Sequence, residues 1–160
     1  MLYFAYGVNL NRAHMRLWCP SSAPAGQAAL ADHRLAFRVW ADVVPSPGDE
    51  VSGALYQIAA ADLEALDEYE DYPSLYERVR VTVQTESGPV EAFTYRMRAG
   101  RPFALPDDDY LGLIEQGYKD WGLDPALLPM RTEIESARQE RYEALGMELD
   151  ETARDEEAQE

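Results

Sequence analysis

One glutamate in this sequence stands where helical periodicity calls for an apolar side chain. When its segment is placed on a helix at about 100° per residue, Leu63 and Leu66 mark the buried direction. Glu70 follows them at i+7 and i+4 and falls between them on that face. A carboxylate there must be paired, protonated or functional, because an unpaired charge is costly to bury. Two alternatives stay open: the helix ends before Pro73 and Glu70 reaches water, or Glu70 pairs with an arginine such as Arg78.

A second candidate is the run from Tyr6 to Leu10, where a strand gives way to a helix. Gly7 allows the backbone to turn tightly at this junction. The N–H groups at a helix start attract anions such as carboxylates, so the junction could bind a carboxylate. Asn9 could instead be an ordinary helix N-cap.

Most other routes to chemistry are closed by the composition. The two histidines, His14 and His33, have no metal-ligand spacing with cysteine or acidic residues, and we expect them to be structural or on the surface. The sequence has no Walker loop, no GxGxxG run and no GxSxG elbow. Cys19 stands alone, which excludes an internal disulfide and favours a small buried thiol. We therefore expect no metal and no cofactor.

The charge argues against two classes of partner. The net charge is −16 and the sequence pI is about 4.4. Such a chain repels phosphate backbones and anionic membranes, so we expect neither nucleic acid nor membrane as a partner. There is no apolar run long enough to span a bilayer and no signal-peptide pattern at the N-terminus. The expected location is the cytoplasm.

The length of 160 residues is that of one domain. Between Glu148 and Glu160, seven acidic residues stand against Arg154 alone, with almost no apolar periodicity. We expect one folded domain over residues 1–145, followed by an acidic, disordered tail over 146–160.

The elements that would position the candidates are of mixed type. Alternation and turn residues predict five strands: Leu2–Tyr6, Arg34–Trp40, Glu50–Ile58, Arg78–Thr85 and Val90–Met97. Helical spacing predicts Asn9–Trp18, Ala60–Asp71, Pro106–Trp121 and a further stretch within Pro125–Leu145. Loops are expected at Pro20–Gly26 and Val43–Asp49, and Gly53 in mid-strand indicates a bulge or a close backbone approach. This order favours an α+β fold or a mixed barrel over a doubly wound sheet.

Four segments carry a resemblance when they are taken in chain order. They are LYFAYGVNL (2–10), SPGDEVSGALYQI (46–58), LEALDEYED (63–71) and ALPDDDYLGLIEQGYKDWGL (104–123). In this order they resemble the γ-glutamyl cyclotransferase family: its aromatic strand and YGSNL loop, the strand before its catalytic segment, its LDxxE helix and its C-terminal helix. The resemblance covers roughly residues 2 to 130.

The resemblance implies a compact mixed β-barrel with flanking helices and a cofactor-free reaction. In this reaction the α-amine of a γ-glutamyl group attacks its own γ-carbonyl, giving 5-oxoproline and a free amine. The resemblance places this reaction in glutathione metabolism. Glu70 matches the family's acid/base residue. The expected partner is a small-molecule γ-glutamyl substrate, and the expected oligomeric state is a monomer or a homodimer. The positions matched to substrate binding are Tyr3, Ala5, Tyr6, Gly7, Val8, Asn9, Tyr76, Tyr95 and Tyr110.

Three departures from the family pattern bear on the substrate. Val8 stands where the family usually has serine, and Asp71 stands where glycine often follows the glutamate. A second carboxylate close to Glu70 could raise its proton affinity. Asp42 lies in a stretch that is apolar or hydroxylated in many relatives.

Three functions are compatible with the sequence. The first is a cyclotransferase acting on γ-glutamyl amino acids or γ-glutamyl amines. The second, favoured by Val8, is a ligand-binding or regulatory relative that kept the pocket and lost turnover. The third is a structural or interaction protein that recruits a basic partner through its acidic tail and its C-terminal helix.

Overall fold

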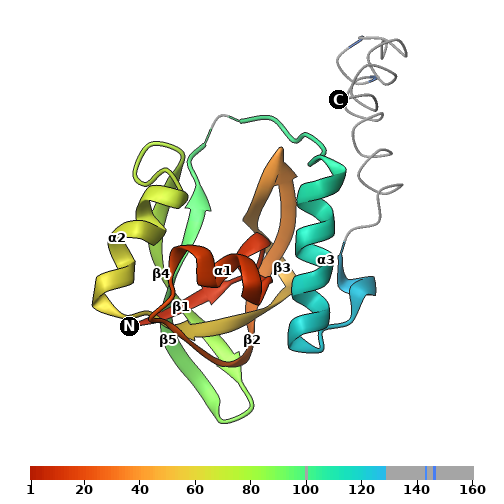
Figure 1. Cartoon of the computed structure of the whole chain (residues 1–160). Coiled ribbons are helices and arrows are strands. Elements are labelled where there is room, and N and C mark those ends of the chain that lie inside the picture. The colour runs from red at the N-terminus through yellow and green to blue at the C-terminus, as the bar shows by residue number, and fades with distance from the viewer. Residues whose placement is uncertain (100, 129–142, 144–145, 147–160) are drawn as a thin grey trace. The chain divides into compact units, whose positions relative to one another are not determined.

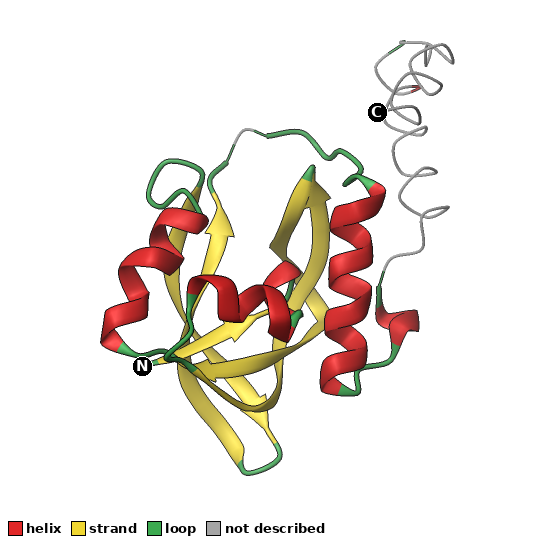
Figure 2. Ribbon diagram, viewed as in Figure 1, coloured by secondary structure: helices red, strands yellow, loops and turns green. Residues whose placement is uncertain are grey.

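The computed structural model has a closed barrel of five strands with mixed pairing (Figure 1). It describes residues 1–99, 101–128, 143 and 146. Around the barrel the strands follow the order β1-β3-β2-β4-β5, and β1 (Leu2–Ala5) pairs antiparallel with β3 and parallel with β5. Helices lie outside the strands, with α2 and α3 on opposite sides in the view of Figure 2. The predicted α+β fold with a mixed barrel and flanking helices is confirmed.

The longest hairpin differs from the prediction. β2 (Ala23–Arg38) and β3 (Trp40–Gln57) form one continuous antiparallel pair joined at Val39. The loop expected from Pro20 is therefore a strand from Ala23 onward, and the prediction of a loop at Val43–Asp49 is wrong, because these residues all lie within β3.

The register of this hairpin explains the error. Val43 to Pro45 pair with Leu35 to His33, and the next pair joins Glu50 to Ala31. The intervening residues 46–49 form a bulge opposite Asp32, whose Oδ1 accepts a hydrogen bond from the N–H of Gly48. The Pro/Gly composition marked this bulge correctly but hid the strand around it, because a proline at a strand irregularity costs no ladder hydrogen bond.

Close packing of β1 against β3 requires Gly53. A Cβ atom added at Gly53 would lie 2.3 Å from the carbonyl oxygen of Ala5. The expected close backbone approach is confirmed. The strands predicted at Arg78–Thr85 and Val90–Met97 are also present, as the antiparallel pair β4 (Tyr76–Thr85) and β5 (Gly88–Met97).

The first predicted helix is interrupted. A 3₁₀ turn, η1 (Val8–Leu10), precedes α1 (Arg12–Trp18). The break falls at Asn11, whose side-chain oxygen accepts the N–H of His14 at 3.0 Å and so caps α1. The alternative that Asn9 is the cap is therefore wrong.

The two remaining α-helices lie close to their predicted places. α2 spans Ala60–Tyr69 and α3 spans Asp108–Trp121, followed by the 3₁₀ turn η2 (Pro125–Leu127). α3 packs against η1 at Gly117, where an added Cβ would lie 2.6 Å from the backbone nitrogen of Asn11. This contact fixes the turn that follows β1.

Met1–Leu128 form one compact unit, which holds the barrel and its helices. The domain boundary expected at residue 145 lies outside the described residues, as do the tail after Gly146 and most of the helical stretch expected after Leu128. Among the described residues, no helix is both long enough and apolar enough to cross a membrane.

Candidate active site

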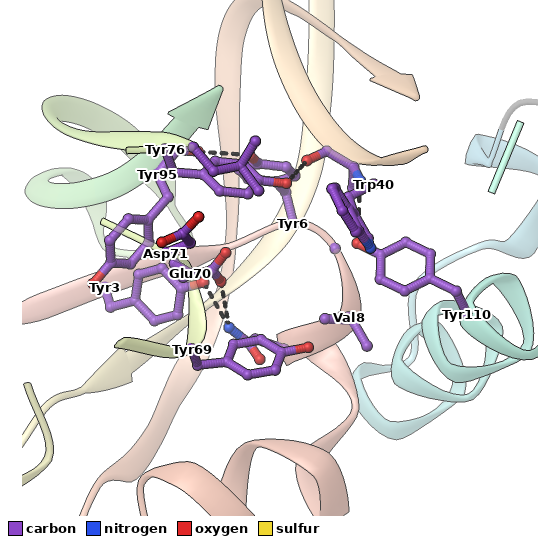
Figure 3. A pocket seen from close by; sticks show the side chains of 14 residues that line it. Tyr3, Tyr6, Val8, Trp40, Tyr69, Glu70, Asp71, Tyr76, Tyr95 and Tyr110 are labelled. Atoms are coloured by element: carbon purple, nitrogen blue, oxygen red, sulfur yellow. Dashed lines mark hydrogen bonds between the residues drawn. The ribbon is translucent and has the colours of Figure 1, made fainter. Parts of the chain in front are cut away.

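A pocket of about 290 Å³ opens between the end of β1, the start of β3 and the end of α2 (Figure 3). β4, β5 and α3 complete its wall. Half of the lining residues are aromatic, and the lining residues are Tyr3, Tyr6, Gly7, Val8, Asn9, Trp40, Ala41, Tyr69, Glu70, Asp71, Leu75, Tyr76, Tyr95 and Tyr110.

Glu70 lies just after the last residue of α2 and turns into this pocket. One turn earlier, Leu66 is fully buried, whereas Leu63 is half-buried, so the predicted apolar face is confirmed at Leu66. The helix ends at Tyr69, as one alternative required, but the Glu70 carboxylate accepts a hydrogen bond from the Asn9 Nδ2 at 2.9 Å. The alternative that Glu70 pairs with Arg78 is wrong, because Arg78 pairs with Asp67 at 3.5 Å.

Burial gives Glu70 unusual acid–base properties. Removal from water raises the pKa of its carboxyl from an ordinary value of 4.5 to about 8, although the hydrogen bond from Asn9 lowers the pKa. The neighbouring Asp71 is exposed and has a left-handed backbone with φ 51°. Burial, rather than a second carboxylate, is therefore the main cause of the raised pKa of Glu70.

The side chain of Asn9 acts on Glu70. Its Nδ2 donates to Glu70 Oε1 and also to the hydroxyl of Tyr3 at 3.1 Å. Asn9 is only 2% exposed, and its main-chain carbonyl oxygen accepts a hydrogen bond from the hydroxyl of Tyr56 at 2.8 Å. Among the described residues, no group donates to its Oδ1. The amide is thus held with its donor side toward the carboxylate.

The corner between β1 and η1 comes close to β3. A Cβ atom at Gly7 would lie 2.9 Å from the Cβ of Ala41, so only glycine fits without a shift. The corner is closed by the N–H of Leu10, which donates to the carbonyl of Gly7. The first N–H groups of such a turn have no acceptor within the turn itself and are available to a ligand.

Tyrosine hydroxyls fix the backbone around the pocket. Tyr76 donates to the carbonyl of Ala41 at 2.6 Å, and the N–H of Ala41 donates to the hydroxyl of Tyr110 at 3.1 Å. Tyr6 donates to the carbonyl of Tyr95 at 2.5 Å. Burial raises the pKa of each of these hydroxyls above its ordinary value, so they stay protonated.

Nine of the ten positions singled out from the sequence line this pocket. The exception is Ala5, which is fully buried and does not reach the pocket. Sequence reasoning missed Trp40, Ala41, Tyr69 and Leu75, and it noted Asp71 only as a second carboxylate beside Glu70. Tyr69 and Asp71 could have been found as chain neighbours of Glu70, whereas nothing in the local sequence connects Trp40 with that helix.

The cysteine and the two histidines, to which sequence reasoning assigned no catalytic role, do not line the pocket. Cys19 is 1% exposed, and burial raises the pKa of its thiol to about 11. His14 shares a hydrogen bond of 2.9 Å with the hydroxyl of Tyr69, and His33 bonds to the carbonyl of Ala31. Within the part of the chain that the structure describes, no group of histidine, cysteine and acidic residues could hold a metal ion.

Comparisons with known proteins point to one family. Residues 3–122 match the family described as γ-glutamyl cyclotransferase, AIG2-like. The chain is 33% identical over 135 residues to the human protein named γ-glutamylcyclotransferase, which covers 76% of this chain and 72% of the relative. It is 39% identical to bovine γ-glutamylaminecyclotransferase over only 54 residues, 32% of each chain. A solved γ-glutamyl cyclotransferase structure superposes with a TM-score of 0.72 at 31% identity, covering 94% of this chain and 89% of that one.

Proposed function

This chain belongs to the AIG2-like γ-glutamyl cyclotransferase family, and we propose that it converts a γ-glutamyl amide into 5-oxoproline and a free amine with Glu70 as general acid–base. The family makes the chain an enzyme of the cyclotransferase type with a small-molecule substrate. The identity of the base and the course of the reaction are the parts of the proposal that follow from the pocket.

The observation that carries the proposal is the buried carboxyl of Glu70, with its pKa near 8. A group whose pKa lies close to the working pH can both accept and return a proton. The α-amine nitrogen attacks the γ-carbonyl carbon and gives one proton to Glu70. As the bond to the leaving nitrogen breaks, Glu70 passes that proton to it, so no water, metal or redox partner is consumed.

Positioning supplies a large part of the rate in this proposal. The ring closes only when the γ-glutamyl chain is folded so that its amine meets its own carbonyl, and fixing that geometry removes an entropic barrier. The aromatic wall of the pocket would hold the folded chain, and the N–H groups of the Gly7–Asn9 corner would receive its carboxylate or the developing oxyanion.

A second candidate function rests on Val8. This residue lines the pocket and is 6% exposed, at the position where the family resemblance calls for serine. If the missing hydroxyl were required for turnover, the chain would bind a γ-glutamyl ligand without converting it.

The test is release of 5-oxoproline from a panel of γ-glutamyl dipeptides and γ-glutamyl amines. Wild type should release it, and Glu70→Gln should lower kcat by about 10²- to 10⁴-fold, the usual contribution of a general acid–base. Glu68→Gln is the matched control, because Glu68 is an exposed glutamate on the same helix.

Equal turnover by wild type and Glu70→Gln would remove Glu70 from the chemistry. No release by folded wild type, together with thermal stabilisation by the same compounds, would favour the binding function. Restoration of turnover by Val8→Ser would then identify the missing hydroxyl as the cause.

A further inference from the structure

The pocket has a second end, away from Glu70, at Trp40. Figure 3 shows the Trp40 ring across the pocket from Glu70 and beside Tyr110. Trp40 is 39% exposed and begins β3 directly after Val39, whose φ of 72° lies in the left-handed region. A β-branched residue rarely adopts that conformation, because it is sterically strained, and such strain is concentrated at functional sites. The turn that places Trp40 in the pocket wall therefore contains a strained backbone conformation at Val39.

Arg101 lies over the outer part of this wall. Its guanidinium carbon is 5.6 Å from the centroid of the Trp40 ring, and the side chain is exposed. Other arginines near the pocket are neutralised: Arg78 pairs with Asp67 and Arg38 pairs with Asp42. Within the described residues Arg101 makes no ion pair, so its charge is available to a ligand.

A buried carboxylate holds the main chain at Arg101 in place. Asp42 is 2% exposed and accepts the N–H groups of Val43 and Met97, each at 2.9 Å. It also accepts Arg38 Nε at 3.2 Å, and Arg38 Nη1 in turn donates to the carbonyl of Arg101. Asp42, the unusual acid noted in the sequence, thus anchors the segment that brings Arg101 to Trp40.

The charges of the lining divide the pocket. Glu70 and Asp71 are the charged residues that line it, and no lysine or arginine is among the lining residues described. In the proposed reaction the γ-glutamyl group occupies the Glu70 end. Asp71 would repel a leaving group that carries its own carboxylate, because the raised pKa of Glu70 keeps that carboxyl largely protonated. At the other end, Arg101 lies beside the Trp40 ring and makes no ion pair within the described residues.

We propose that Trp40 and Arg101 form a leaving-group subsite that favours γ-glutamyl amino acids over γ-glutamyl amines lacking a carboxylate. The inference rests on the proposed function and names its substrate class. The side chain of the released amino acid lies against the Trp40 ring, and its α-carboxylate meets the Arg101 guanidinium, which is able to bind a carboxylate in a bidentate fork.

Two substrates isolate the carboxylate. γ-Glutamyl-phenylalanine and γ-glutamyl-phenethylamine have the same scissile amide and the same ring and differ only in the carboxylate of the leaving group. Wild type should convert the phenylalanine compound with a kcat/KM higher by about two- to fivefold, the upper part of the range of one exposed ion pair. Arg101→Gln should raise KM for this compound and remove the preference, leaving the phenethylamine compound within about twofold of wild type.

Two further variants complete the experiment. Arg80→Gln is the charge-matched control, because Arg80 is an exposed arginine of β4 paired with Glu91 and is not a lining residue. Trp40→Ala should lower kcat/KM for both compounds alike, since both lose the ring contact.

The outcomes separate the subsite from the reaction. A lost preference in Arg101→Gln but not in Arg80→Gln supports the subsite. Equal effects of both arginine variants, or a wild type that converts the two compounds equally or prefers the phenethylamine compound, overturn the subsite alone. No 5-oxoproline from either compound, or from the wider panel, overturns the proposed function and the subsite with it.

Discussion

The two ends of the pocket differ in burial and in the kind of contact that fixes them. At the Glu70 end, Asn9 and Tyr3 are 2% and 4% exposed, and the Asn9 amide donates hydrogen bonds to both the Glu70 carboxylate and the Tyr3 hydroxyl. At the Trp40 end, the tryptophan is 39% exposed and its neighbour Arg101 is in contact with solvent.

This difference separates chemistry from selectivity. A reacting carboxylate needs low polarity around it to shift its pKa, and it needs buried partners to hold its direction. An exposed tryptophan and arginine provide weaker contacts that can vary without disturbing the core. Ala41 joins the two ends, because it is bonded to Tyr76 and Tyr110 and packs against Gly7.

The largest effect is expected where α3 packs against η1, the turn that carries Asn9 to Glu70. Gly117→Ala places a Cβ within 2.6 Å of the backbone nitrogen of Asn11. Since backbone must move, we expect a loss of about 3 kcal/mol in the free energy of unfolding, the upper range for overpacking. Gly112→Ala is the control on the same helix, because nothing lies within 4 Å of its added Cβ. It should stabilise the helix by about 1 kcal/mol. Urea unfolding of both variants checks this, and equal stabilities would contradict the proposed packing.

The next largest effect is expected at Ala41, which joins the Glu70 end of the pocket to the Trp40 end. Tyr76→Phe removes the hydroxyl that donates to the buried carbonyl of Ala41. An unsatisfied buried acceptor costs about 1–3 kcal/mol, so thermal unfolding should shift down accordingly. Because Ala41 borders both Gly7 and Trp40, the variant should also raise KM. An unchanged melting temperature would mean that the two ends are not coupled through this bond.

The pH dependence of stability sharpens the comparison. The Glu70 pKa is about 8 when folded and 4.5 when it is unperturbed, so the folded chain holds this proton more tightly. Between these two pH values, unfolding releases a proton from Glu70. The protonated carboxyl therefore stabilises the fold fully below pH 4.5, and this stabilisation is lost as the pH rises to 8. Glu70→Gln does not titrate and keeps the hydrogen bond acceptor for Asn9.

The difference between the two proteins should therefore grow with pH. We expect Glu70→Gln to exceed wild type by at least ~1.4 kcal/mol above the folded pKa, which is the value of one pKa unit, and to match it in acid. Differential scanning calorimetry across this range measures it. A difference that is constant with pH would show that Glu70 is not protonated by burial.

The smallest effect concerns Val8. If the Gly7–Asn9 corner binds substrate through N–H groups, a hydroxyl at position 8 adds nothing. Val8→Ser and Val8→Ala, which lose similar volume, should then have kcat/KM values within about threefold, less than the value of one hydrogen bond. A serine variant that exceeds the alanine variant by more would indicate that the hydroxyl contacts the substrate.

Much of the Glu70 end could be predicted because its signals are local. Leu63, Leu66 and Glu70 lie within two helical turns, so their periodicity places them on one face without knowledge of the fold. Gly7 marks a tight turn for a similarly local reason. Predictions that depended on a choice between local structures were less successful: Asn11, and not Asn9, caps α1, since the cap depends on where the 3₁₀ turn ends.

The Trp40 end could not be predicted, because the contacts that bring Arg101 and β5 to it are distant in sequence. Arg101 reaches Trp40 across sixty-one positions of the chain, and the buried Asp42 is satisfied by the N–H of Met97 from another strand. The strand around Pro45 was also missed, since its pairing with β2 outweighs the local preference of a proline-rich segment.

The sequence by itself determined the class of fold, the family resemblance and a glutamate on an apolar helix face, because periodicity and motif order are properties of the chain. The tertiary structure decided which partners that glutamate has, how strongly burial raises its pKa, and which side chains face it across the pocket. The physical reason is that desolvation and hydrogen-bond geometry depend on what surrounds a group in space, and closure of the barrel brings β1, β3, β5 and α2 together around Glu70.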